Sequence, residues 1–438
     1  MDIGMHPGWS GRLQRLAERI ALCNALIFAV AVLLRIAAAF WLPRAILWDD
    51  GFRYVKVADI LWFEGNGFGG IYENWQSVPT QPLVIAGLFA MFGRSFLALR
   101  LGFSVIGAFS CVLGGALARR LFGNVAGLLA GLLLAIYPHF IYLSALFEYP
   151  QTLFIFLMGA FLLLHYRYRA NERLLTLFFA ALFLGLATIT VPTILPFVPL
   201  FVLTLSRERF TRWLGRACIV GIAVAIPLGA WAVRNTLAYG EFVLVNRSSG
   251  QVFWAGNNED YYQYGREAVA PACAPGYEQT THCLENRELD ARLAGRTDQG
   301  ISVINEHESE SWRHGFEFIR ASPWRFVLLT ARKALEFWSP MPNAVTANDQ
   351  KSIAARDVIS VIASVPLLIA AIAAMLLFAR RWRELLPLYL YIATFWGLYS
   401  LFLPQMRYRL PLDFVLIVIA AGGLAHWLAR GAAPRHQS

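Results

Sequence analysis

The sequence predicts an all-α polytopic membrane protein with about ten transmembrane helices, interfacial helices and extracytoplasmic loops. Two observations support this fold class. Hydrophobic residues make up 58% of the 438 residues, charged residues only 15%, and the mean hydropathy is +0.51. This balance is unlike that of a soluble globular chain. In addition, apolar runs of roughly 20 residues, the length that a helix needs to cross a bilayer, recur along most of the chain.

The basic residues act as topology signals. The formal net charge is +10, but Lys and Arg lie in short clusters between apolar runs, which argues against a nucleic-acid-binding protein. The positive-inside rule places four such clusters in the cytoplasm: residues 118–120, 166–173, 206–216 and 379–384. The first apolar run, residues 23–42, is too long for a signal-peptide core and follows three arginines, which predicts an uncleaved anchor with a cytoplasmic N-terminus.

The apolar runs, taken in order, predict both termini in the cytoplasm. The spans are expected near residues 22–42, 98–118, 125–146, 150–166, 174–190, 192–206, 217–233, 357–379, 385–403 and 411–429. The run at residues 82–93 is too short for an ordinary span, so we expect an interfacial or re-entrant helix there. Arg35 lies inside the first span, where it either snorkels or pairs internally.

Two polar segments, residues 43–97 and 234–356, are expected outside the bilayer. They divide the chain into an N-terminal transmembrane module (1–233), an extracytoplasmic loop region (234–356) and C-terminal transmembrane helices (357–438). The middle region contains a predicted amphipathic helix that carries Arg325, Arg332 and Lys333, a pattern typical of a membrane surface.

The cysteines and histidines of the middle region suggest a disulfide but no recognisable metal site. Cys273 and Cys283 face the predicted outside, where a disulfide closing the short loop is favoured over free thiols if that side is oxidising. His282, His307 and His314 lie nearby, but their spacing matches no zinc pattern, so we assign no metal site.

Asp49 and Asp50 follow the first predicted span, in the sequence "WDDGFRY". One interpretation is structural, because Asp50 can accept the free amide N–H groups of a helix that begins at Gly51 or Phe52. The other is catalytic: one carboxylate takes a proton from an incoming hydroxyl group while the other orients it or holds a cation. The residues alone leave both interpretations open.

Further charged residues are expected on the same external face. Glu148 precedes Pro150 at the start of a predicted span, where it either caps the helix or takes part in function. External cations run against the topology rule, and they are explained either by an anionic ligand or by anchoring to lipid headgroups. The candidates for phosphate binding are Arg53, Lys56, Arg234, Lys333, Arg407 and Arg409.

Several stretches, in this order, carry a resemblance to a known family: "WDDGFRYVKVADIL", "VPTQPLVIAGLFAMFGRSFLALRLGFS", "WAVRNTLAYGEFVLVNRSSGQVFWAGNN" and "MRYRLPLDFVL". Together they resemble the polytopic GT-C glycosyltransferases, in particular the bacterial branch similar to protein mannosyltransferases (glycosyltransferase family 39) and aminoarabinose transferases. The resemblance implies the GT-C fold. It also implies that Asp50 or Asp49 is the catalytic base, with Asp50 favoured because Tyr54 follows it.

The resemblance further implies transfer of a sugar from a polyprenyl-phosphate donor to an extracytoplasmic glycan, lipid or protein, in a bacterial inner membrane. No cofactor is required, although a divalent metal is compatible with this chemistry, and no nucleic-acid partner is expected. The alternative is a transporter or flippase of a lipid-linked saccharide, which would predict paired repeats and broken helices near the midplane. A polysaccharide ligase or polymerase on another fold would share the same chemistry.

Overall fold

The structure is a computed structural model that describes residues 19–42, 49–62, 78–205, 209–265, 279–293, 300–341 and 350–431. Helices dominate these residues, and none of them forms a strand. The longer helices of the bundle are α2 (Ile20–Trp41), α6 (Phe96–Phe122), α9 (Gln151–Asn171), α12 (Phe210–Tyr239), α18 (Gln350–Leu377), α19 (Trp382–Leu401) and α20 (Met406–Gly431). The shorter ones are α5 (Thr80–Phe92), α7 (Asn124–Ile136), α8 (Pro138–Leu146), α10 (Leu174–Thr188), η1 (Pro192–Ile194), α11 (Phe197–Val202) and η4 (Ala379–Arg381).

Nine of the ten predicted spans fall mainly on α-helix, whereas in the described part of the tenth, residues 192–205, the short η1 and α11 alternate with turns. Within the described residues, six are long and apolar enough to cross a membrane, and a seventh span results if α7 and α8, bent by 56°, are taken together. The helices α5, α10 and η1 with α11 are shorter. Helix α19 has 20 residues but is not among these six, and its first turn carries Arg383 and Glu384. A helical polytopic membrane protein is therefore confirmed, whereas the number of ten spans stays a prediction.

The bundle has an inner layer and an outer layer. In the most apolar windows of α9 and α20, 72% and 67% of the residues are buried, against 22% in α2 and α18, which therefore lie at the outside. Helices α6 and α7 approach closely through glycines, because a Cβ on Gly115 would lie 2.9 Å from the Gly127 carbonyl oxygen. Small residues permit this kind of contact between membrane helices.

Arg35 of α2 pairs inside the protein. Its side chain is 1% exposed, and its guanidinium donates hydrogen bonds to the carbonyl oxygens of Ala31 (3.1 Å), Ala135 (3.2 Å) and Leu134 (3.4 Å). The sulfur of Cys111 accepts a further contact at 3.4 Å. Of the two options left open by the sequence, internal pairing is therefore correct, and snorkelling is not.

The four basic clusters meet at one end of the bundle, as the topology argument requires. Arginines from each cluster contact another cluster or the end of a neighbouring helix: Arg120 to the Tyr166 carbonyl (2.8 Å), Arg169 to the Glu384 carbonyl (2.9 Å), Arg381 to the Leu121 carbonyl (2.7 Å) and Arg216 to the Glu172 carboxylate (3.7 Å). The prediction that these clusters share one side is confirmed by these contacts. Which compartment that side faces stays a prediction.

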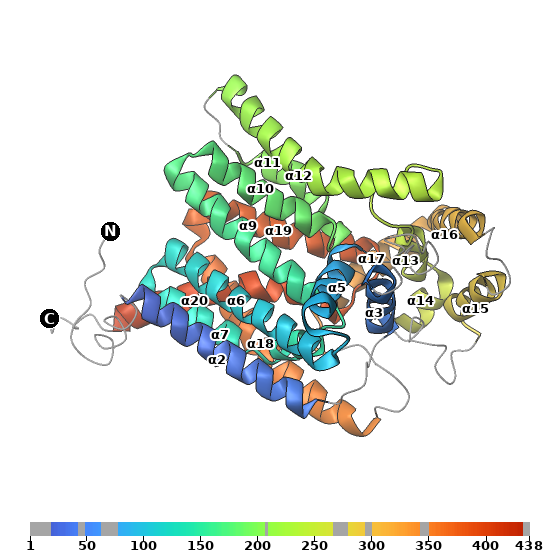
Figure 1. Cartoon of the computed structure of the whole chain (residues 1–438). Coiled ribbons are helices and arrows are strands. Elements are labelled where there is room, and N and C mark those ends of the chain that lie inside the picture. The colour runs from blue at the N-terminus through green and yellow to red at the C-terminus, as the bar shows by residue number, and fades with distance from the viewer. Residues whose placement is uncertain are drawn as a thin grey trace.

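The predicted extracytoplasmic segments gather at the other end. Helices α3 (Asp49–Trp62), α13 (Ser249–Ala255), α14 (Glu259–Tyr264), α15 (Thr281–Leu293), α16 (Gly300–Ala321) and α17 (Pro323–Glu336) lie together there, far from the start of α2 and the end of α20 (Figure 1). Helix α12 bends on its way toward this end and contains Pro227, a residue that kinks helices (Figure 1).

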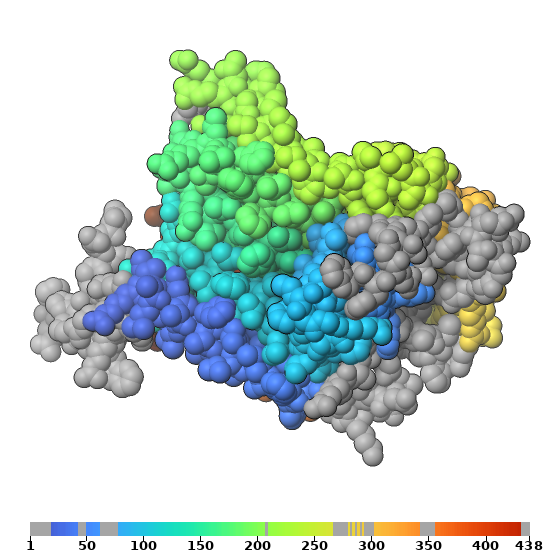
Figure 2. Space-filling model, viewed as in Figure 1, coloured from blue at the N-terminus to red at the C-terminus, as the bar shows by residue number. Residues whose placement is uncertain are grey.

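The outer face of α12 is open along much of its length (Figure 2). Its exposed side chains include Ile222 (61%), Val233 (61%) and Leu237 (81%). An apolar face of this kind suits contact with lipid.

An apolar face on α3 seats it against the bundle. Tyr54, Val55 and Ala58 are buried in a cluster with Phe89 of α5 and Phe103 of α6. The spacing of these positions makes one stripe of an amphipathic helix. Asp50 lies four residues before Tyr54 on the same side of α3, so the packing of this stripe turns Asp50 toward the bundle.

Candidate active site between α3 and α20

Asp50 forms the centre of a cluster of charges. The Nη1 atom of Arg407, from the first turn of α20, lies 2.6 Å from Asp50 Oδ2, and Arg53 Nη1 lies 3.4 Å from Asp50 Oδ1. The side chains of Asp50, Arg407 and Arg53 are 26%, 27% and 34% exposed. The short contact to Arg407 is a charge-assisted hydrogen bond. The site is therefore partly open, with one carboxylate shared by two cations.

Aromatic rings surround the Arg407 guanidinium. Its central carbon lies 4.8 Å from the ring centroid of Tyr149 and 5.0 Å from that of Tyr408, and Nη2 donates to the Tyr408 hydroxyl at 3.1 Å. Tyr408 stacks on Tyr399, with centroids 4.3 Å apart and planes at 6°. The Tyr399 hydroxyl is 3.0 Å from that of Thr193. Planar guanidinium groups stack well on such faces, so Arg407 is held in one orientation.

The electrostatics keep Asp50 ionised. Burial by itself would raise the pKa of Asp50, but the charges of Arg407 and Arg53 and the hydrogen bond from Arg407 outweigh it and hold the pKa below its usual value. Burial raises the pKa of the Tyr54 hydroxyl, and the charge of Asp50 raises it further. At neutral pH the site therefore contains a carboxylate, two guanidinium groups and neutral phenols.

Glu148 lies in a constrained turn beside this cluster. It is 1% exposed, and it follows Phe147, whose φ of +55° is in the left-handed region. Gln81 of α5 donates to the Phe147 carbonyl at 2.5 Å and anchors the turn. Burial raises the pKa of Tyr149; Arg407 opposes this rise, whereas Asp50 and Glu148 add to it. Glu148 directly precedes Tyr149, whose ring lies against Arg407, so it lies beside the Asp50 cluster.

The other predicted residues of the first external loop and of α12 are placed as follows. Asp49 lies in the first turn of α3, and its side chain is outside what the structure describes. Lys56 is exposed on α3. Arg234 lies 5.0 Å above the Trp231 ring and donates to Asn235 Oδ1 at 3.0 Å, so it is held on its own helix.

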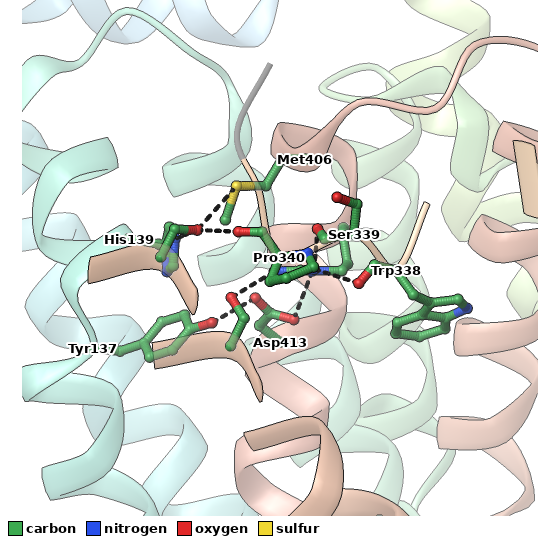
Figure 3. A network of polar contacts seen from close by, with 10 residues as sticks. Tyr137, His139, Trp338, Ser339, Pro340, Met406 and Asp413 are labelled. Atoms are coloured by element: carbon green, nitrogen blue, oxygen red, sulfur yellow. Dashed lines mark hydrogen bonds and ion pairs between the residues drawn. The ribbon is translucent and has the colours of Figure 1, made fainter. Parts of the chain in front are cut away.

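Lys333 and Arg409 are fully buried, each at 0% exposure. Arg409 donates to the carbonyl oxygens of Trp338 (3.2 Å) and Ser339 (2.7 Å) and lies 3.5 Å from the Asp413 carboxylate. Figure 3 shows this network, in which Tyr137 also donates to Asp413 at 2.8 Å. Protein oxygens already accept hydrogen bonds from the N–H groups of both cations. The arrangement therefore gives no support to the predicted role of Lys333 and Arg409 as phosphate ligands.

Sequence reasoning missed most of the surroundings of Arg407, including Tyr149, Tyr399, Tyr408 and Thr193. Tyr149 was adjacent to Glu148 and Tyr408 to Arg407, but no sequence signal indicated that they would share a site. For Arg409 a signal did exist, since Asp413 follows it by four residues on a helix, the spacing of an intrahelical ion pair.

Of the two cysteines in the predicted disulfide, one lies within the described residues. Cys283 is disulfide-bonded, whereas Cys273 lies outside the described residues, so their pairing stays a prediction. Across the parts of the chain that the structure describes, no three His, Cys, Asp or Glu side chains cluster in a way that could hold a metal ion. Burial lowers the pKa of His307, so its neutral form is favoured.

Comparison with known proteins gives two matches of different kinds. Residues 77–231 match the family model described as dolichyl-phosphate-mannose-protein mannosyltransferase. The fold is similar to that of the oligosaccharyltransferase AglB from Archaeoglobus fulgidus, solved with an inhibitory peptide and a dolichol-phosphate, with a TM-score of 0.51 and 15% identity. The apo form of the oligosaccharyltransferase from the same organism gives a TM-score of 0.52, also at 15% identity. No curated protein matches the sequence significantly.

The structural matches extend over nearly all of this chain but over only part of the matched proteins. The two structural matches cover 94% and 93% of this chain, but the chain spans only about half of those proteins, 52% and 51%. At such low identity, structural similarity shows the fold alone, whereas the family match is a match of sequence and includes Glu148 and Tyr149. Residues 77–231 are thus similar in sequence to a mannosyltransferase family, and the chain as a whole is similar in fold to an archaeal oligosaccharyltransferase.

Proposed function

We propose that the protein transfers a sugar from a polyprenyl-phosphate-linked donor to an acceptor hydroxyl on the extracytoplasmic side of a bacterial inner membrane. The observation that carries this proposal is the Asp50–Arg407 pair, 2.6 Å apart and partly exposed at the end of the bundle opposite the basic clusters. In this proposal the pair supplies a base and a cation side by side, at the level where a lipid headgroup would meet water. The dolichol-phosphate solved with AglB supports a lipid-linked donor.

In this proposal the acceptor oxygen attacks the anomeric carbon of the donor. The bond between that carbon and the phosphate oxygen breaks, and the phosphate leaves with the bonding electron pair. Asp50 takes the hydroxyl proton as the new bond forms, a contribution of typically about 10²- to 10⁴-fold. Its low pKa keeps it in the basic form at neutral pH.

Arg407 and Arg53 stabilise the negative charge that builds up on the leaving phosphate. Both now contact Asp50, so a bound phosphate would share their donors. Arg407 carries more than one N–H group, and the guanidinium fork can contact a carboxylate and a phosphate oxygen at once. The aromatic rings of Tyr149 and Tyr408 keep that fork oriented while its partners change.

The test is reconstitution of the full chain in proteoliposomes with a radiolabelled polyprenyl-phosphate sugar and a mixture of envelope glycolipids as acceptors. We expect transfer of label by the wild type and its loss in Asp50→Asn. Glu259→Gln, a substitution of an exposed carboxylate on α14 that pairs with Arg325, is the matched control and should keep full activity. Movement of the labelled lipid between leaflets without transfer would contradict the proposal and indicate a flippase.

A further inference from the structure

A junction of helix ends surrounds the ammonium group of Lys333. Its Nζ atom lies 3.0 Å from the carbonyl oxygens of Gly256, Leu401 and Phe402 and 2.8 Å from Asn257 Oδ1. Leu401 ends α19 and Gly256 follows α13, so the ammonium sits where two helices present unsatisfied carbonyls and the negative ends of their dipoles.

The backbones at this junction are packed without spare room. A Cβ on Gly256 would lie 2.0 Å from the Phe402 carbonyl oxygen, so only glycine fits there. Asn257 adds a second link, since its amide donates to the Leu401 carbonyl at 2.9 Å. The end of α19 is therefore tied to α13 and α17 immediately before the chain turns into α20.

Arg409 makes the reciprocal connection. It projects from α20 and donates to the Trp338 and Ser339 carbonyls, which directly follow α17. Its Nη2 atom also donates to Ser364 of α18 at 2.8 Å. Lys333 of α17 thus binds carbonyl oxygens at the end of α19, and Arg409 near the start of α20 binds carbonyl oxygens just after the end of α17.

Arg407 lies between these two connections. It is six residues after Leu401 and two before Arg409, in the first turn of α20. The first turn of a helix has few hydrogen bonds of its own to fix its position. An outside support is therefore needed if Arg407 is to stay 2.6 Å from Asp50.

We propose that Lys333 and Arg409 form a two-cation brace that positions Arg407 against Asp50, so that they are positioning residues rather than ligands of the donor phosphate. This inference rests on the proposed function only in the activity it predicts, because the brace itself is a property of the fold. In this proposal helices α13 and α17 hold the first turn of α20 in register.

The test compares Lys333→Met with Arg332→Met, its matched control. Both substitutions remove one positive charge from α17, but Arg332 is exposed and pairs with Glu336 at 2.7 Å, outside the brace. In Lys333→Met we expect kcat for sugar transfer to fall by about 10- to 10²-fold, as for a misplaced catalytic geometry, with the KM for the donor lipid unchanged. Arg332→Met should keep both constants.

A second measurement does not depend on activity. Hydrogen exchange of the intact protein in nanodiscs, followed by mass spectrometry, should show several-fold faster exchange across residues 401–410 in Lys333→Met and no change in Arg332→Met. Arg409→Lys, which keeps the charge but cannot reach two carbonyls and Ser364 together, should fall between wild type and Lys333→Met. If Lys333→Met does not fold, Trp396→Phe removes one donor to the Ala334 carbonyl at the same junction and should give a smaller increase.

Two outcomes would overturn the brace. A raised KM for the donor with unchanged kcat and unchanged exchange would make Lys333 a phosphate ligand after all. Unchanged exchange in Lys333→Met, Arg409→Lys and Trp396→Phe would show that the first turn of α20 needs no support. If the wild type transfers no sugar, the proposed function fails, while the exchange measurements still decide on the brace.

Discussion

The contact between Asp50 and Arg407 permits a sharp distinction between a catalytic base and a structural ion pair. We consider the single substitutions Asp50→Asn and Arg407→Gln and the charge swap Asp50→Arg with Arg407→Asp. If Asp50 only anchors Arg407, the swap restores what each single change removes. If Asp50 accepts the proton of the acceptor, the swap restores the ion pair and leaves the enzyme inactive.

The expected magnitudes separate the two effects. The pair is about a quarter exposed, so its loss should cost about 1 to 2 kcal/mol of unfolding free energy, between the values of surface and buried pairs. Loss of a general base of about 10²- to 10⁴-fold corresponds to about 2.7 to 5.4 kcal/mol of activation free energy. Asp50→Asn should therefore lose far more activity than its stability change explains.

The assay measures sugar transfer and thermal unfolding on the same samples. We expect the single substitutions to lower the Tm by at most about 4 °C and the swap to return at least half of that loss. Activity should stay below one hundredth of the wild type in Asp50→Asn and in the swap. Recovery of activity in the swap, or more than a tenth of wild-type activity in Asp50→Asn, would refute the assignment of Asp50 as the base.

Three other predictions concern pH, topology and the disulfide. Arg407 and Arg53 hold the pKa of Asp50 in the folded protein below its value in the unfolded chain. The ionised carboxylate therefore stabilises the fold at any pH above the unfolded pKa, and this stabilisation is lost as the pH falls through the folded pKa. Arg407→Gln should therefore move the acid limb of kcat/KM to higher pH, and an unmoved limb would exclude Asp50 as its source. A cysteine introduced at Arg119 should resist an impermeant thiol reagent in intact cells; ready labelling would reverse the topology. Peptide mapping without reduction should find Cys283 linked to Cys273, and another partner would disprove that loop.

Local hydropathy predicted much of the fold, because bilayer length and apolar composition constrain each helix separately. The break between α7 and α8 was not predicted, since Pro138 begins α8 inside an apolar run that reads as one span. The packing of helices also lay beyond local patterns. Which face of α2 turns inward depends on partners about a hundred residues away, such as the Ala135 carbonyl that accepts from Arg35.

The site was predictable only in part, for a similar reason. Asp50 and Arg407 were named from the sequence, but they are 357 residues apart, so nothing local indicated their pairing. Lys333 and Arg409 carry the same charge as Arg407 and lie in similar segments. Lys333 and Arg409 differ from Arg407 in being fully buried, and this burial depends on the tertiary contacts of α17 and α20.

The enclosed guanidinium of Arg35 sets a constraint on how the protein is made. Two of its acceptors, the carbonyls of Leu134 and Ala135, leave the ribosome about a hundred residues after Arg35 itself. An arginine near the centre of a lone helix costs about 2.5 to 3.5 kcal/mol on insertion. The arginine of the first helix therefore gains these two partners only after the later helix has been made.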